Sequence, residues 1–167
     1  SALAYGPQDA FTSGIAGILQ TVPYIFLAPG DGRNLLQPIW AQDLVTCLAW
    51  SLEDRDTINR LYEIGGPEYF PFKQIVEMIM EKIQVRRRLI FLRPPYMRWL
   101  TKFLDTVIPN LPVSVYWLHY FAANRTCALD TVSREFKLMP ARFGQQIDYL
   151  HGQNWRSKIL KSIWLRN

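Results

Sequence analysis

The chain has 167 residues, a net charge of +5, a hydrophobic fraction of 49% and a charged fraction of 20%, which suits one globular domain and excludes an intrinsically disordered protein. Its apolar runs are far shorter than the roughly 20 residues of a membrane-spanning helix. Four basic residues and no acidic ones lie in residues 155–167, which leaves +1 for the rest of the chain. This uneven distribution argues against a nucleic-acid-binding face spread over the body.

The cysteines and histidines predict no metal site. Cys47 and Cys127 form no C-x-x-C pair, and His119 and His151 stand alone in the sequence. Metal sites need several such ligands at short, regular spacing. We therefore expect no metal, and cysteines that are structural in a reducing, cytoplasmic compartment.

The first third of the chain alternates strand and helix signals. Gly6-Pro7 turns the backbone directly after an apolar run, and Asp9 or Thr12 could cap the helix that follows. In order, we expect a strand at 1–5, a helix to about 21, a strand at 24–27, a turn at 29–32, an extended segment at 35–40 and a helix at 43–53. That last helix carries its apolar residues on one face, at Leu44, Val45, Leu48, Ala49 and Leu52. No strand precedes the one at 1–5, so we expect the chain to be the second half of a larger domain.

The remainder of the chain is richer in helices. We expect, in order, a buried strand at 61–64, an amphipathic helix from Pro71 or Phe72 to residue 83, a strand at 89–92, helices at 96–107 and 114–123, and short helices at 131–136 and 143–150. The apolar face of the helix at 72–83 consists of Phe72, Ile75, Val76, Ile79, Met80 and Ile83. The alternation predicts an α/β fold, with one edge of a parallel sheet and a mostly helical appendage.

An ordered set of short segments resembles a known family. Tyr5-Gly6-Pro7 with Asp9 comes first, and Gly30-Asp31-Gly32, residues 37–43 (QPIWAQD), 62–68 (YEIGGPE) and 136–143 (FKLMPARF) follow. Together they are similar to the C-terminal half of extended or atypical short-chain dehydrogenase/reductase proteins, the NAD-dependent epimerase/dehydratase group. The nearest branch is the one that contains the nucleotide-binding accessory subunit of respiratory complex I. The resemblance covers roughly residues 1–150.

The resemblance implies the C-terminal part of a Rossmann-like NAD(P)-binding fold, with the last parallel strands and a mostly helical substrate-side domain. It divides the chain into the end of the Rossmann-like domain interleaved with substrate-side segments (1–70), a helical substrate-side domain (71–150) and a basic amphipathic tail (151–167). NAD or NADP would be the cofactor of the full-length parent. Its missing N-terminal half would be the main partner of this chain and would hold most of the cofactor.

Two elements of the family's chemistry are absent from the sequence. The nine glycines form no G-x-G-x-x-G turn, the motif that lets a backbone and a helix N-terminus approach a pyrophosphate. The family's catalytic Tyr-x-x-x-Lys pair lies upstream of the Tyr-Gly-Pro turn. The one formal match here, Tyr69 with Lys73, lies downstream and has Pro71 between the two residues, so we reject it. We therefore assign no catalytic residue and expect the chain to be inactive alone.

The candidate cofactor-binding residues are Ala4, Tyr5, Gly6 and Pro7. In the family, the loop that leaves this strand borders the nicotinamide end of the cofactor, and ligands of open α/β sheets bind at the carboxyl ends of strands. The alternative is a plain strand-to-helix turn.

Two residues are candidates for the substrate side. Where sugar-nucleotide members of the family carry a phosphate-binding arginine, this chain has Leu36, which disfavours a nucleotide-sugar substrate. Arg33 lies nearby in a turn and is a substrate-side candidate or a solvated residue. Gln37 could donate to a neutral substrate or make a structural bond.

The tail combines aromatic and basic residues. Trp155, Ile159, Ile163 and Trp164 gather within half a helical wheel, and the basic residues lie mostly opposite. This pattern suits a membrane interface reached through residues 155–167. The alternatives are a final helix that packs on the body, or a frayed end.

Three functions stay open on this evidence. The parent is an NAD(P)-dependent oxidoreductase or epimerase, a non-catalytic dinucleotide-binding accessory protein of a membrane-associated complex, or a membrane-peripheral partner. We also expect the chain alone to self-associate, because the strands at 1–5 and 61–64 would leave apolar faces and an open edge.

Overall fold

The computed structural model describes residues 3–7, 9–93, 95–96, 99 and 123–157. Most of the predicted helices at 96–107 and 114–123 and most of the predicted tail lie outside these residues. The described elements, in chain order, are β1 (Ala4–Tyr5), α1 (Thr12–Thr21), β2 (Ile25–Pro29), β3 (Leu35–Leu36), β4 (Ile39–Trp40), α2 (Ala41–Glu53), the 3-10 turn η1 (Arg55–Thr57), β5 (Phe70–Pro71), α3 (Phe72–Lys82), β6 (Arg88–Leu92), α6 (Thr131–Phe136), α7 (Phe143–Gln146) and the 3-10 turn η2 (Ile147–Leu150).

The strands pair in twos, and two of the pairs are parallel. β2 runs parallel to β6, with Ile25 opposite Arg88 and Pro29 opposite Leu92. β1 runs parallel to β4, whereas β3 and β5 are antiparallel. The architecture is therefore mixed α/β with short parallel strand pairs, as predicted, and it is consistent with a Rossmann-like fold.

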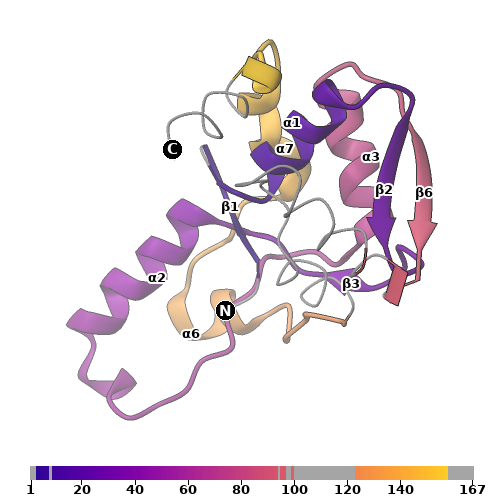
Figure 1. Cartoon of the computed structure of the whole chain (residues 1–167). Helices are drawn as coiled ribbons and strands as arrows, with labels where there is room; N and C mark the ends of the chain where they lie inside the picture. The colour runs from indigo at the N-terminus through magenta and orange to yellow at the C-terminus, as the bar shows by residue number, and fades with distance from the viewer. Residues whose placement is uncertain (1–2, 8, 94, 97–98, 100–122, 158–167) are drawn as a thin grey trace.

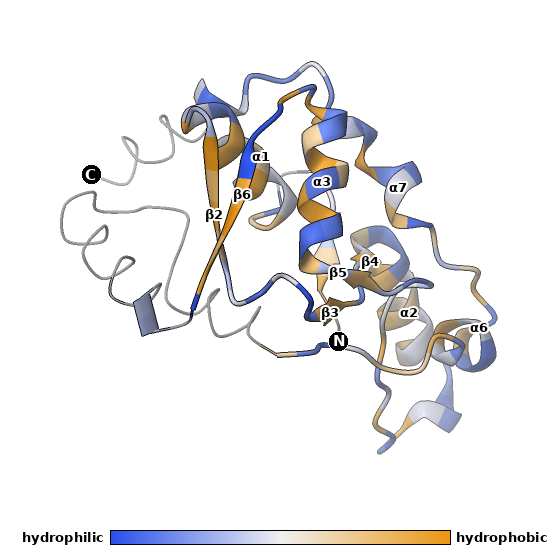
Figure 2. Cartoon of the chain, turned by 90° about the vertical axis from the view of Figure 1, so that its right-hand side faces the viewer, coloured by the Kyte–Doolittle hydropathy of each residue, from blue (hydrophilic) through white to orange (hydrophobic). Residues whose placement is uncertain are grey.

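Helices α1 and α3 cover one face of the β2/β6 pair (Figures 1 and 2). The apolar stripe predicted for α3 is confirmed: its long side chains point into the main core, and Ile75, Val76 and Ile79 are fully buried. They meet Leu19 of α1 and Phe26 of β2 in that core. The 3.6-residue periodicity of the sequence thus locates this helix and its buried face correctly.

A smaller core lies under α2. Its buried members are Ile39, Cys47, Ile64, Val132 and Phe136, so that α2 and α6 are packed together around the β4 strand. Cys47 is the one fully buried residue that α2 contributes, and its thiol is free. Burial raises the pKa of this thiol, and the nearby Asp43 carboxylate adds to the shift.

One sequence expectation near α2 is wrong. Residues 61–64 form no strand, and Leu61 is 93% exposed while Ile64 is buried. The segment keeps the alternating burial of a strand, but no described strand pairs with it, and without a ladder partner the pattern does not make a strand. The apolar residues that the sequence puts on one face of α2 are only partly buried: Leu44 packs on the small core, whereas Val45, Leu48 and Leu52 are exposed.

The end of the described chain packs onto the main core. Trp155 is 4% exposed, and its indole N–H donates to the Leu150 carbonyl at 3.0 Å. The backbone N–H of Trp155 donates to the Gln20 side chain at 2.8 Å. This arrangement matches the predicted alternative of a segment packed on the body for Trp155, and the remaining tail residues lie outside the description.

The main core crosses both of the predicted domain boundaries. It contains Leu3 from the first part, Phe143 from the second and Trp155 from the third. The division at residues 70 and 150 stays a prediction. Among the residues that the structure describes, none of the helices has the length and apolar character needed to cross a bilayer.

Candidate functional site

The turn between β1 and α1 lies at the carboxyl edge of a parallel strand pair. β1 and β4 align with Ala4 opposite Ile39 and Tyr5 opposite Trp40, so both strands end together, and α2 begins directly after β4. The Asp9 N–H donates to the Gly6 carbonyl at 3.0 Å, which closes the turn. A Cβ on Gly6 would lie 3.3 Å from the Ala41 Cβ, so this position has little room for a side chain.

The four predicted cofactor-binding residues divide into two groups. Ala4 and Pro7 are exposed, whereas Tyr5 and Gly6 are buried. The Tyr5 ring packs edge-on against Trp40 at 5.3 Å and Phe143 at 4.8 Å between ring centroids. A ligand at this edge would therefore meet Ala4, Pro7 and the turn backbone, and the Tyr5 side chain would support the turn from the core.

The Tyr5 hydroxyl is a buried polar group for which the described structure shows no hydrogen-bond partner. Burial is the main cause that raises the pKa of Tyr5 well above its usual range, and the carboxylate of Asp43 adds to it. A phenol held neutral in this way is a poor proton donor. The side chain therefore suits a structural role better than acid catalysis.

A hydrogen-bonded chain of three side chains fixes the start of α1. The Asp9 carboxylate accepts from the backbone N–H groups of Thr12 at 2.9 Å and Ser13 at 3.0 Å, and so caps the helix. The Thr12 hydroxyl lies 2.7 Å from the same carboxylate and 2.6 Å from the Tyr149 hydroxyl. An ionised carboxylate can only accept, so Thr12 donates to Asp9 and Tyr149 donates to Thr12.

Burial is the main cause that keeps Tyr149 in its protonated form. Burial raises the pKa of Tyr149, and the Asp9 carboxylate raises it further, against a smaller opposite effect of the bond to Thr12. The sequence offered Asp9 or Thr12 as the cap, and the structure shows Asp9 in that role. The sequence did not point to Tyr149, because 137 positions separate Tyr149 from Thr12. No local pattern in the sequence marks such a contact.

The two substrate-side candidates lie in different surroundings. Arg33 is an exposed residue of the turn between β2 and β3, and its backbone N–H donates to the Asp31 carboxylate at 3.0 Å. Gln37 is fully buried, and its amide N–H donates to the Gly66 carbonyl at 2.7 Å. Its amide oxygen accepts from the Cys127 backbone N–H at 2.7 Å and from the Cys127 thiol at 3.2 Å. Of the two roles predicted for Gln37, substrate contact and structural bond, these bonds support the structural one.

The glycines after residue 64 let this buried amide approach closely. A Cβ on Gly65 would lie 2.4 Å from the Gln37 side-chain carbon Cδ, and one on Gly66 would lie 1.8 Å from the Pro38 carbonyl oxygen. Any side chain at Gly66 would displace backbone. The two glycines are therefore needed to pack this segment against β4.

The rejected Tyr69 and Lys73 pair makes separate contacts. The Tyr69 hydroxyl donates to the Cys127 carbonyl at 2.5 Å, and the Lys73 ammonium faces Glu77 at 3.7 Å. The two side chains thus have different partners, which agrees with the rejection made from Pro71.

A separate cavity of about 320 Å³ lies between the end of α3 and the α7/η2 segment. Met78, Gly144 and Ile147 form its apolar part, and Glu81, Lys82, Gln84 and His151 its polar rim. His151 Nδ1 lies 3.2 Å from the Lys82 carbonyl, and the Lys82 ammonium pairs with Asp148. Sequence reasoning did not find this cavity, and it contains none of the predicted site residues.

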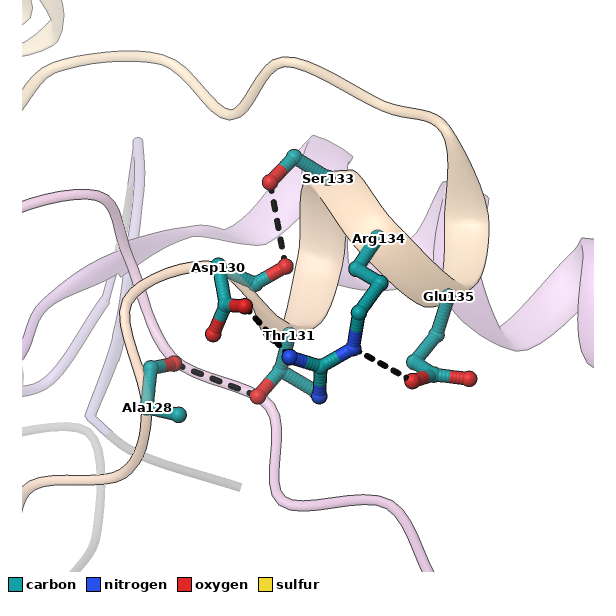
Figure 3. Close-up of polar contacts among 6 residues, drawn as sticks. All are labelled: Ala128, Asp130, Thr131, Ser133, Arg134 and Glu135. Carbon is teal, nitrogen blue, oxygen red and sulfur yellow. Dashed lines mark hydrogen bonds and ion pairs between the residues drawn. The ribbon is translucent and has the colours of Figure 1, made fainter.

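An exposed polar network surrounds the start of α6 (Figure 3). Arg134 pairs with Asp130 and, at 2.9 Å, with Glu135. The hydroxyls of Ser133 and Thr131 donate to the carbonyls of Asp130 and Ala128 at 3.0 and 3.2 Å. These bonds are local to the helix, and exposed pairs of this kind contribute little to stability. In the described part of the chain, no cluster of three or more histidines, cysteines or carboxylates could hold a metal ion.

Comparisons with known proteins identify the fold and no family. No protein-family model and no curated protein matches the chain. Among solved structures, gox2253 matches with a TM-score of 0.59 at 16% identity, over 88% of this chain and 45% of that one. At this identity the match shows a shared fold alone.

Two further solved structures match more loosely. They are MlghC, a GDP-mannoheptose C4 reductase from Campylobacter jejuni with NADP bound, and CJ1428, a GDP-D-glycero-L-gluco-heptose synthase from the same organism in the presence of NADPH. Each has a TM-score of 0.47, at 12% and 10% identity, over 95% of this chain and 47% and 51% of theirs. These TM-scores are too low to support an argument about function. The chain spans about half the length of each of these three structures.

Proposed function

We propose that the chain is the substrate-side part of an NAD(P)-dependent protein of the short-chain dehydrogenase/reductase type, epimerase/dehydratase-like or reductase-like. Its β1–α1 turn would border the nicotinamide end of the dinucleotide. The observation that carries the proposal is the parallel β1/β4 pair, which brings the Gly6-Pro7 turn and the start of α2 to one strand edge. In open α/β sheets, ligands bind at the carboxyl ends of the strands.

The residues at this edge fit a nicotinamide ring better than a pyrophosphate. Ala4 and Pro7 offer exposed apolar surface without charge, and Gly6 adds backbone close to the same edge. A flat, mostly apolar ring can pack on such a surface, whereas phosphates need backbone N–H clusters or cations. When bound, the nicotinamide would supply hydride transfer.

The role of this chain in that reaction is to position groups. The Tyr5 ring supports the turn from the core, and the bonds of Asp9, Thr12 and Tyr149 fix the first turn of α1 beneath it. The nearby phenols Tyr5 and Tyr149 are held protonated. The proton-transferring pair of the reaction would therefore belong to the other part of the parent protein, and the chain alone would not turn over substrate.

The non-catalytic accessory function uses the same surface. An accessory protein would differ from the enzyme only because the full-length parent would not turn over substrate. An intact Tyr-x-x-x-Lys pair in the rest of the parent would favour the enzyme. Membrane-peripheral attachment through residues 155–167 remains a separate proposal. The burial of Trp155 removes one of its four apolar side chains from an interfacial role in this conformation.

The proposal is tested by mapping NADPH contacts on the whole 167-residue chain. A two-dimensional ¹H–¹⁵N spectrum is followed while NADPH is added to about 10 mM, a range suited to weak binding. We expect shifts grouped on the amides of Ala4, Tyr5, Gly6 and Asp9. Shifts grouped instead around the α3–η2 cavity, or none at this edge, would contradict the proposal.

A matched pair of variants separates direct NADPH contact at the carboxyl end of β1 from effects that any added surface tryptophan would cause. Ala4→Trp places a bulky ring on the exposed edge and should weaken the NADPH shifts by about tenfold or more. Ala128→Trp changes an exposed alanine of another segment in the same way and should leave the shifts unchanged. Equal NADPH shifts in both variants would count against the assigned surface.

A further inference from the structure

Helix α2 carries a broad apolar sector that is only partly buried. Its inner face places Leu44 and Cys47 against the small core of Ile39, Ile64, Val132 and Phe136. Its outer face carries Val45, Leu48 and Leu52 at exposures of 61%, 53% and 89%, with the exposed Ala49 between them. Apolar side chains gathered on one side of a surface helix normally face a packing partner, so the outer part of this sector has the composition of a contact surface.

The segment after α2 extends this surface. Ile58 is 65% exposed and Leu61 93% exposed. The Thr57 hydroxyl donates to the Ser51 carbonyl at 2.6 Å, which ties the η1 turn to the end of α2 and brings Ile58 next to it. Figure 1 shows α2 and this segment at the border of the molecule. We call Val45, Leu48, Ala49, Leu52, Ile58 and Leu61 the α2 patch.

We propose that the α2 patch is an interface through which a second copy of this chain binds, with the two α2 helices antiparallel around a two-fold axis. The sequence order of the patch suits this symmetry. Positions 45, 48, 49 and 52 are arranged evenly about the midpoint between Leu48 and Ala49. An antiparallel pair centred there sets Val45 opposite Leu52 of the second copy, and Leu48 opposite Ala49 of the second copy.

This pairing matches large side chains with small ones and leaves no charge in its centre. Each Leu48 faces an alanine, which lets the two helices approach closely. None of the six patch residues is charged. The carboxylate of α2 nearest the patch is the exposed Glu53, which follows Leu52 at the end of the helix and so lies at the rim of the pairing, away from the axis. Asp43 accepts from the Ala141 backbone N–H at 2.7 Å on the inner side. No unpaired charge therefore needs to be desolvated at the axis.

The size of the patch also fits a dimer. At roughly 100 Å² for each of its five large side chains, the patch offers about 500 Å² of apolar surface. A standard interface buries about 800 Å² per partner, of which about 65% is apolar in homodimers. The patch thus supplies the apolar share of one standard interface, and polar neighbours of α2 would supply the rim.

The oligomeric state of the full 167-residue chain tests this interface. Sedimentation velocity is measured from about 1 to about 200 µM, and we expect a concentration-dependent dimer in that range. Leu48→Lys would place two ammonium groups near the axis and should weaken dimerisation by about 100-fold. Met139→Lys, which introduces the same charge at a 90% exposed methionine outside the patch, should leave it unchanged. Far-UV circular dichroism establishes that each variant is folded.

The antiparallel register has its own test. Val45→Lys and Leu52→Glu should each weaken the dimer, and the double variant should recover it by about tenfold, because each lysine then faces a glutamate of the second copy. A chain that stays monomeric at about 200 µM would overturn the proposal, as would a dimer that Leu48→Lys leaves intact. Weakening by both single substitutions without recovery in the double variant would overturn the antiparallel arrangement.

Discussion

Gln37 connects three segments that are far apart in the sequence. Its buried amide joins the start of β4 to Gly66 and to Cys127. The sequence left this residue between a substrate contact and a structural bond, since a lone glutamine carries no pattern that separates the two. In the structure, the amide N–H and the amide oxygen of Gln37 both form hydrogen bonds within the chain, so the role of this residue is structural.

Gly66 is the most sensitive glycine of that arrangement. We expect Gly66→Ala to lower the free energy of unfolding by about 3 kcal/mol, because its Cβ would lie 1.8 Å from a backbone carbonyl oxygen. Gly14→Ala is the matched control: a Cβ on Gly14 in α1 meets nothing within 4 Å, so it should stabilise by about 0.5–1 kcal/mol. Urea unfolding measures both, and equal effects would show that the close approach at Gly66 is unimportant.

The buried phenol of Tyr5 makes the stability of the fold depend on pH in the alkaline range. The pKa of Tyr5 in the folded chain is raised from its ordinary value of 10.0, mainly by burial. At a pH between the pKa of Tyr5 in the unfolded chain and its higher pKa in the folded chain, the folded chain retains a proton that the unfolded chain releases. The stability contributed by neutral Tyr5 is therefore complete below about pH 10 and is lost as the pH rises further.

Tyr5→Phe removes this titration without removing a hydrogen bond to a described group. We expect the variant to keep the free energy of unfolding at neutral pH and to show a shallower loss between about pH 10 and about pH 11. Tyr24→Phe, at an 82% exposed tyrosine, should leave the wild-type slope unchanged. Urea unfolding over this pH range decides the matter, and identical slopes for all three proteins would refute the role of Tyr5.

At the scale of elements, helices with a clear periodicity were predictable, whereas the partner of each strand was not. The position and buried face of α3 followed from its apolar spacing, and the bounds of α6 at Thr131–Phe136 were predicted correctly. The segment at 61–64 has a strand-like sequence but no described strand beside it. The local sequence of a segment does not show whether another strand will pair with it. For α2 the pattern identified an apolar stripe, yet only tertiary structure shows that most of the stripe faces outward.

The cap of α1 is an element-level feature that sequence reasoning found. Asp9→Ala should cost about 1 kcal/mol of stability, because it removes acceptors from the backbone N–H groups of Thr12 and Ser13. Asp9→Asn keeps an acceptor and should recover most of this loss. Thermal unfolding of the two variants tests the cap, and a loss of the same size in Asp9→Asn would indicate that the charge of Asp9, not its capping bond, is what matters.

At the scale of the whole molecule, the fold class was predictable and the candidate site only in part. The alternation of strand and helix signals predicted the mixed α/β architecture with parallel pairs. The sequence also pointed to the β1–α1 turn, because a strand followed by Gly-Pro marks a strand edge. It could not show that Tyr5 faces the core, that Tyr149 reaches Thr12, or that α3 and η2 enclose a cavity, because each depends on residues distant in the chain.

The central claim is that this chain supplies the nicotinamide-side edge of a dinucleotide site, and that the groups holding the pyrophosphate lie elsewhere in the parent protein. Calorimetric titration of the 167-residue chain with NADPH tests it most directly. We predict a dissociation constant no tighter than about 1 mM, because an apolar edge without phosphate contacts offers little binding free energy. A micromolar dissociation constant would contradict the claim, since these residues would then bind the whole dinucleotide themselves.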